Sequence, residues 1–170
     1  MVNCASICFI VSKATPTIIS IPVLDKVSAA TSVTSLTTKG TTFVDAELKK
    51  LIPKYGDGVE RKALDSRFWL PSEQGAKFAL TWGVAKHGWI RERFDCDDHA
   101  WWAKAILSMT YLVNCVAFVN DHSSGHAYNL VLCWDRSFFW EPQPNSQGVP
   151  VGEINIGADP YKLEWGYVAI

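Results

Sequence analysis

Residues 95–102 read Asp-Cys-Asp-Asp-His-Ala-Trp-Trp, and the rest of the chain can be interpreted outward from this stretch. Positions 96, 100, 103 and 107 carry small or apolar residues with helical spacing, so the sequence predicts a buried helix from Cys96 to about Met109. Cys96 then lies in the first turn, on the face that packs inward. Backbone N–H groups at a helix start favour an anion, so this position suits a nucleophilic thiolate.

Two later stretches, Gly-His-Ala-Tyr-Asn at 125–129 and Trp-Glu-Pro-Gln at 140–143, supply the groups that a nucleophilic thiol needs. Strand-like runs on either side of Asp135-Arg136 predict a hairpin whose two outer ends carry His126 and Glu141. A strand rises about 3.3 Å per residue, so these two side chains are expected within hydrogen-bonding reach. His126 is the predicted base for the Cys96 proton, and Glu141 is the predicted partner that fixes its ring.

Three alternatives stay open for these residues. His122, in the turn-forming stretch 120–125, competes for the role of base and is expected to be a solvated loop residue. Cys96 and His126 also suit a core in which a thiol and an imidazole are buried and satisfied. A zinc site built from Cys96, His99 and His126 lacks the paired spacing that such sites usually have.

Asp95, Asp97 and Asp98 crowd the predicted helix start. The helix dipole alone can stabilise carboxylates there. A bound hard cation is the other interpretation, because oxygens from Asp97, Asp98 and the amide of Gln143 suit calcium better than zinc.

Composition narrows the class of protein. With 170 residues, of which 48% are hydrophobic and 19% charged, the chain suits one well-packed domain. A formal net charge of −1 and scattered basic residues argue against nucleic acid as a partner. The sequence has neither an apolar run of about 20 residues nor a basic leader, so neither a membrane span nor secretion is expected. Five cysteines without a regular framework predict free thiols and a reducing, cytoplasmic compartment.

The chain divides at about residue 42. Residues 1–42 are rich in Ser, Thr, Val and Ile and predict an extended, β-prone arm, which is either a simple N-terminal leader or a segment that packs on another subunit. Residues 43–170 are the predicted domain, with helices at 45–51 and 73–86, an irregular segment after Pro142 and a strand at 165–170. The expected fold class is α+β, with the Cys96 helix packed on a small antiparallel sheet.

Taken in order, Asp-Cys-Asp-Asp at a helix start, Gly-His-Ala on a strand and Glu-Pro-Gln ending the next strand resemble a known family. They are similar to the papain-like C-terminal domain of the Marasmius oreades-type agglutinins, whose members include calcium-dependent cysteine peptidases. The resemblance covers about residues 60–145. It implies a papain-like fold, with Cys96 as nucleophile, His126 as base and Glu141 as third member or metal-facing carboxylate. The calcium-facing residues that it implies are Asp97, Asp98, Glu141 and Gln143.

From these residues and this resemblance we expect a calcium-activated thiol hydrolase, either a cysteine peptidase or an amidase. It would act on peptide or related amide bonds through an acyl-enzyme on Cys96. A transferase with the same three residues is equally consistent with the sequence. The alternative from another class is a non-catalytic assembly module, such as a virion or other oligomer component, that reuses the papain-like fold and associates through residues 1–42. The agglutinins carry a β-trefoil sugar-binding domain ahead of this one, and nothing in this sequence has its repeats, so the resemblance does not imply sugar binding.

Overall fold

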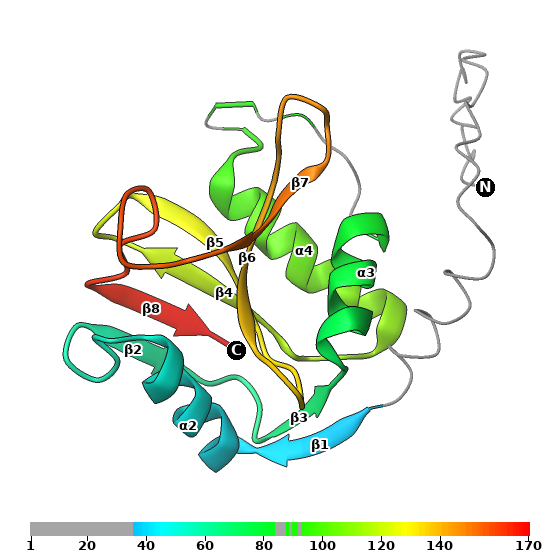
Figure 1. Cartoon of the computed structure of the whole chain (residues 1–170), viewed down its shortest axis with the longest axis vertical. Coiled ribbons are helices and arrows are strands. Elements are labelled where there is room, and N and C mark those ends of the chain that lie inside the picture. The colour runs from blue at the N-terminus through cyan, green and yellow to red at the C-terminus, as the bar shows by residue number, and fades with distance from the viewer. Residues whose placement is uncertain (1–35, 84–87, 89, 92) are drawn as a thin grey trace, which may run out of the picture.

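Helices and two sheets make up the computed structural model of the protein (Figure 1), which describes residues 36–83, 88, 90–91 and 93–170. The helices in this part of the chain are α2 (Thr41–Leu51), α3 (Glu73–Gly83) and α4 (Cys96–Tyr111). The strands are β1 (Thr37–Gly40), β2 (Val59–Lys62), β3 (Arg67–Leu70), β4 (Val116–Asp121), β5 (His126–Val131), β6 (Phe138–Pro144), β7 (Pro150–Ile154) and β8 (Gly166–Ala169). The predicted α+β class is confirmed. None of the described helices is long and apolar enough to cross a membrane.

The larger sheet has six strands in the order β2-β8-β4-β5-β6-β7, and β1 pairs with β3 separately. All neighbours in the larger sheet are antiparallel except β2 and β8, which run parallel. The predicted C-terminal strand is confirmed, and Figure 1 shows it inserted between β2 and β4. The sheet is therefore larger than the small antiparallel sheet that was expected. The C-terminal strand β8 pairs with β4 on one side and with β2 on the other, which adds β2 to the sheet.

Helix α4 begins at Cys96, as its spacing predicted. Asp95 and Asp98 form a capping box at its start, in which the Asp95 N–H donates to the Asp98 carboxylate at 3.3 Å. The buried positions of α4 include the small residues Ala100 and Ala103. Their size lets the helix lie close to the sheet.

Asn129 of β5 holds α4 on the sheet. Its side-chain amide donates to the Ala100 carbonyl at 2.9 Å and to the Ala117 carbonyl at 3.1 Å. Because Asn129 is fully buried, these bonds form out of contact with water, where leaving an amide without partners is costly. They set the position of the first turns of α4 relative to β4 and β5.

The N-terminal boundary of α2 was predicted wrongly. The helix begins at Thr41 after Gly40, and Asp45 does not cap it. Asp45 instead accepts a hydrogen bond from the Tyr55 hydroxyl at 2.7 Å and pairs with Arg61 at 3.4 Å. These contacts come from residues distant in sequence, which local capping rules do not include.

The predicted N-terminal arm falls mostly outside the described residues. Residues 1–35 of the arm, which include Cys4 and Cys8, are not among the described residues. Thr37–Gly40 form β1, which pairs with β3. Association through residues 1–42 stays a prediction, as does the reducing compartment; the three cysteines of the described chain, Cys96, Cys115 and Cys133, are free thiols.

The chain after Pro142 is more regular than predicted. Strand β6 continues to Pro144 and pairs with β7, with a register shift between Glu141 and Pro144. Gly152 of β7 has φ +104°, and a Cβ there would lie 3.8 Å from the Trp140 ring. Pro144 ends β6 and Pro150 begins β7. Prolines in a sequence argue against a strand, so this hairpin was not predicted, although proline is tolerated at strand ends.

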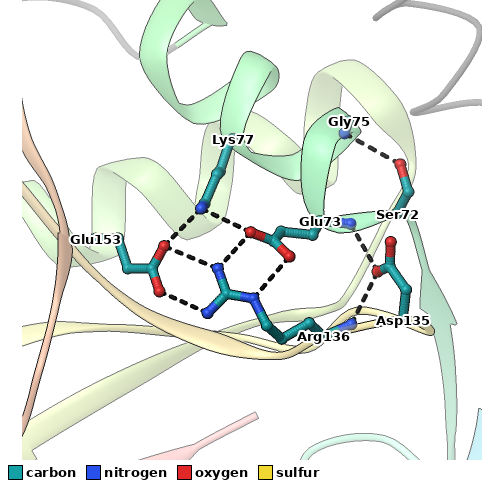
Figure 2. A network of polar contacts seen from close by, with 7 residues as sticks. All are labelled: Ser72, Glu73, Gly75, Lys77, Asp135, Arg136 and Glu153. Atoms are coloured by element: carbon teal, nitrogen blue, oxygen red, sulfur yellow. Dashed lines mark hydrogen bonds and ion pairs between the residues drawn. The ribbon is translucent and has the colours of Figure 1, made fainter.

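Charged side chains pin the far end of the β5–β6 hairpin to α3 (Figure 2). Arg136 donates to both Glu73 and Glu153, and Lys77 bonds the same two carboxylates at 2.7 and 2.5 Å. Hydrogen bonds from Arg136 are the main cause that lowers the pKa of Glu73 and of Glu153 to about 2. Asp135 accepts the Glu73 N–H at 2.8 Å, so the connection between β5 and β6 also binds the start of α3. This connection runs from Val131 to Phe138 and is longer than the predicted tight turn at Asp135-Arg136.

Candidate functional site

Cys96, His126 and Glu141 come together where α4, β5 and β6 meet. Cys96 is the first residue of α4, and its side chain is close enough to the His126 ring to help raise the pKa of that ring. On the other side of that ring, Nε2 lies 2.6 Å from the Glu141 carboxylate oxygen Oε2. The three residues are thus linked in the order thiol, imidazole, carboxylate.

The hairpin register accounts for the His126–Glu141 contact. The last paired residues of β5 and β6 at this end are Asn129 and Trp140. Continuing that register places His126 opposite Gln143, so Glu141 is its diagonal neighbour on the same side of the sheet. Diagonal neighbours lie within reach of long side chains such as glutamate.

The His126 ring is cationic at neutral pH. Burial of the ring by itself lowers its pKa, but hydrogen bonds to Cys96 and Glu141, together with their negative charge, raise it to about 9. The side chain is only 16% exposed, so solvent screens these interactions weakly. An imidazolium beside a cysteine is the arrangement that activates a thiol as a nucleophile.

Glu141 is buried, and protein donors use both of its carboxylate oxygens. Oε1 accepts the Gln143 N–H at 2.9 Å, and Oε2 accepts the Tyr161 hydroxyl at 3.2 Å in addition to facing His126. Burial and the Glu141 charge raise the pKa of Tyr161 to about 12. Tyr161 also packs against the His126 ring, with 5.5 Å between ring centroids. Sequence reasoning missed Tyr161, because it lies twenty residues beyond Glu141 and belongs to no motif.

Asp121, at the end of β4, holds the turn that precedes His126. It is fully buried and accepts hydrogen bonds from the Ser123 hydroxyl at 2.5 Å and the Ser124 N–H at 3.2 Å. The Tyr128 hydroxyl donates to it at 3.3 Å and the Leu163 N–H at 2.8 Å. The sequence contained only a weak signal for this role, an Asp followed by two serines in a turn.

His122 is excluded as the base by its position. It is exposed, as expected of a loop residue, and its ring contacts Trp165 and Tyr167 with centroid distances of 4.7 and 5.8 Å. Cys96 is half-buried and packs against a small cluster of buried residues that includes Ala100 and Phe118, so the interpretation of Cys96 as a core residue stays open. Cys115 is the contrasting case, because burial raises its pKa to about 12.

The predicted calcium-facing residues do not assemble as one set. Asp98 is used in the capping box, and both Glu141 oxygens bind protein donors. In the described part of the chain, one group has metal-ligand atoms close together, namely Asp95, Cys96 and Asp97, whose donor atoms lie within 4.8 Å of one another. A hydrogen bond to Asp95 is the main cause that raises the pKa of Asp97, followed by burial.

The zinc alternative finds no support in the described residues, where no such group joins Cys96, His99 and His126. His99 is instead buried with its ring edge against Phe94, at a centroid distance of 4.6 Å.

Comparison with known proteins gives structural neighbours only, since neither a family model nor a curated protein matches this sequence. A structure of PSL1a, the Polyporus squamosus lectin, in complex with E64 matches 78% of this chain at 20% identity with a TM-score of 0.57. A second structure, of Polyporus squamosus lectin bound to the human-type influenza-binding epitope Neu5Aca2-6Galb1-4GlcNAc, matches 76% at 20% identity with a TM-score of 0.49. This chain spans about half of each, covering 50% and 49% of their lengths.

The PSL1a structure, with its TM-score of 0.57, corrects the sequence-based family and activity. It is a structure of a lectin and not of a papain-like peptidase, so the predicted papain-like peptidase family and the predicted thiol hydrolase, whether peptidase or amidase, are wrong on this comparison. The alternative function, a non-catalytic assembly module that reuses the papain-like fold, depended on the same family resemblance and is not supported by this comparison either. The physical reason is that three short motifs specify a local arrangement of side chains, and unrelated folds and functions can share such an arrangement. At this identity the likeness shows the fold alone.

Proposed function

We propose that this domain binds an electrophilic small molecule covalently through Cys96. The observation that carries the proposal is the His126 ring, whose Nε2 lies 2.6 Å from Glu141 and whose pKa is raised by both Glu141 and Cys96. A thiol held in this way is a better nucleophile than a free one. Cys96 is half-buried, whereas Cys115 and Cys133 are buried, so Cys96 is the most accessible thiol among the described residues.

The proposed step needs no group beyond those in the site and the ligand. The Cys96 sulfur forms a bond to an electrophilic carbon, such as one in a strained oxygen-containing ring. The carbon–oxygen bond of that ring breaks, and the oxygen takes the proton from the His126 imidazolium. Glu141 and Tyr161 keep the imidazole in place while its charge disappears. The product is a stable thioether with a neutral His126.

The test uses E64, because a structural neighbour is described in complex with it. Incubating the full chain with E64 is expected to raise its intact mass by that of one E64 molecule, and peptide mapping is expected to locate the addition at Cys96. Cys96→Ser should abolish the addition. Cys115→Ala, which removes a buried thiol, should leave it unchanged. An addition that survives Cys96→Ser, or its absence from the folded wild-type chain, would contradict the proposal.

We also propose that calcium binds to this domain, with Asp95 and Asp97 at the start of α4 as its ligands. Asp95 raises the pKa of Asp97, and a hard cation bound between two such carboxyl groups would stabilise their ionised forms. Millimolar calcium is expected to raise the thermal unfolding midpoint of the wild type by roughly 2–4 °C, as a ligand of the native state does. Asp97→Asn should remove the increase and the exposed control Asp159→Asn should keep it. Equal increases in all three chains would mean that calcium does not bind here.

A further inference from the structure

A second hollow lies away from Cys96, where the turn before β2 meets the start of β8. Its volume is about 380 Å³. Its lining comes from the turn at 56–58, Glu60, His122 and Trp165-Gly166. Figure 1 shows β2 and β8 side by side at this edge of the sheet. The volume falls in the range of small-molecule sites.

The walls of this hollow are rigid backbone. The N–H groups of Asp57, Gly58 and Val59 all donate to the Lys54 carbonyl at 3.0 Å, which winds the turn tightly. Gly166 then donates to the Gly58 carbonyl at 3.0 Å and joins the two walls.

Both glycines are required by this close approach. A Cβ on Gly58 would lie 2.3 Å from the Glu164 carbonyl oxygen, and one on Gly166 would lie 2.1 Å from the Asn120 carbonyl oxygen. The Asn120 oxygen belongs to β4 and cannot move aside without disturbing the sheet, so a side chain at Gly166 is not tolerated and this wall is held in place by backbone pairing. A site that is formed in advance binds without the cost of ordering itself.

The side chains around the hollow combine one aromatic surface with hydrogen-bond acceptors. Trp165 is 55% exposed, the largest exposed fraction among the tryptophans of the described residues, and its ring meets the His122 ring edge-on. Asp57 and Glu60 are exposed carboxylates, each able to accept several hydrogen bonds. Lys54 lies 3.8 Å from Asp57 and offsets its charge.

We propose that this hollow binds a saccharide ring. A pyranose has an apolar C–H face, which fits the indole of Trp165, and a rim of hydroxyl donors, which fits the carboxylates of Asp57 and Glu60. Because the Asp57 charge is offset by Lys54, a neutral polyhydroxyl ligand fits better than a cation. The inference rests on residues separate from the Cys96 site, so it stands or falls independently of covalent binding there.

Saturation-transfer NMR on the full chain tests this site. The probes are the methyl glycosides of β-galactose, β-glucose and α-mannose, with choline as a cationic comparison. At least one glycoside is expected to receive saturation from the protein. Trp165→Ala is expected to lower that signal by about five-fold or more, as loss of an aromatic anchor does, and Glu60→Gln to weaken it less.

The controls separate this site from other surfaces and from the Cys96 site. Trp134→Ala should leave the signal unchanged, because Trp134 is comparably exposed at 47% but lies at the opposite end of the β5–β6 hairpin. Cys96→Ser should also leave it unchanged. A signal from choline alone, no signal from any glycoside, or signals that persist undiminished in both Trp165→Ala and Glu60→Gln would overturn the proposal.

Discussion

Replacing His126 with alanine is expected to slow alkylation of Cys96 by iodoacetamide at pH 6.5 by roughly 10-fold to 100-fold. An unpaired thiol with an ordinary pKa of about 8.5 is only about 1% ionised at that pH, whereas a neighbouring imidazolium stabilises the thiolate. The raised pKa of His126 keeps a positive charge beside Cys96, so the wild-type rate should depend less on pH than the rate of His126→Ala. The two rates should converge at high pH, where His126 loses its proton and with it the charge that distinguishes the two proteins.

Peptide-level mass spectrometry measures this rate at Cys96 separately from the other four cysteines. His122→Ala is the matched control, because it removes the nearest competing histidine and should leave the profile unchanged. Glu141→Gln should give an intermediate rate, since the ring keeps a hydrogen-bond acceptor and loses the negative charge. Identical pH profiles for the wild type and His126→Ala would mean that Cys96 is not activated.

Replacing Asp121 with alanine is expected to lower the free energy of unfolding by roughly 3–5 kcal/mol. The buried carboxylate accepts bonds from Ser123, Ser124, Tyr128 and Leu163, so its removal leaves four donors without their partner. Urea denaturation measures the change, and the thermal midpoint should fall by roughly 10 °C. The loss should be larger than that from any exposed charge in the same domain.

Asp159→Ala is the control for Asp121. It removes an exposed carboxylate that pairs with Lys162 at 3.0 Å, and such surface pairs contribute at most about 1 kcal/mol. A loss from Asp121→Ala no greater than that from Asp159→Ala would mean that water replaces Asp121 as acceptor for the turn. The turn would then not depend on this side chain for its conformation.

The candidate site was visible in the sequence as far as local rules reach. Helical spacing placed Cys96 at the start of α4, and alternating strand patterns around Asp135-Arg136 placed His126 and Glu141 at one end of a hairpin. These features depend on hydrogen bonds between residues close in sequence, so they can be predicted from the types of residue and their spacing. The same rules missed the start of α2 and the β6–β7 pairing, where partners distant in sequence or prolines at strand ends decide the outcome.

The sequence by itself determined which residues form the central helix and hairpin and that a cysteine, a histidine and a glutamate meet there. Only the tertiary structure decided that Tyr161 and Asp121 support this site, that β8 enters the sheet between β2 and β4, and that Asp98 and Glu141, two of the predicted calcium ligands, accept hydrogen bonds from the protein itself. It also produced the hollow at Trp165, whose walls come from chain segments more than a hundred residues apart. The reason is physical: local patterns encode backbone periodicity, whereas buried polar side chains take whichever partners the packing of distant segments brings within reach.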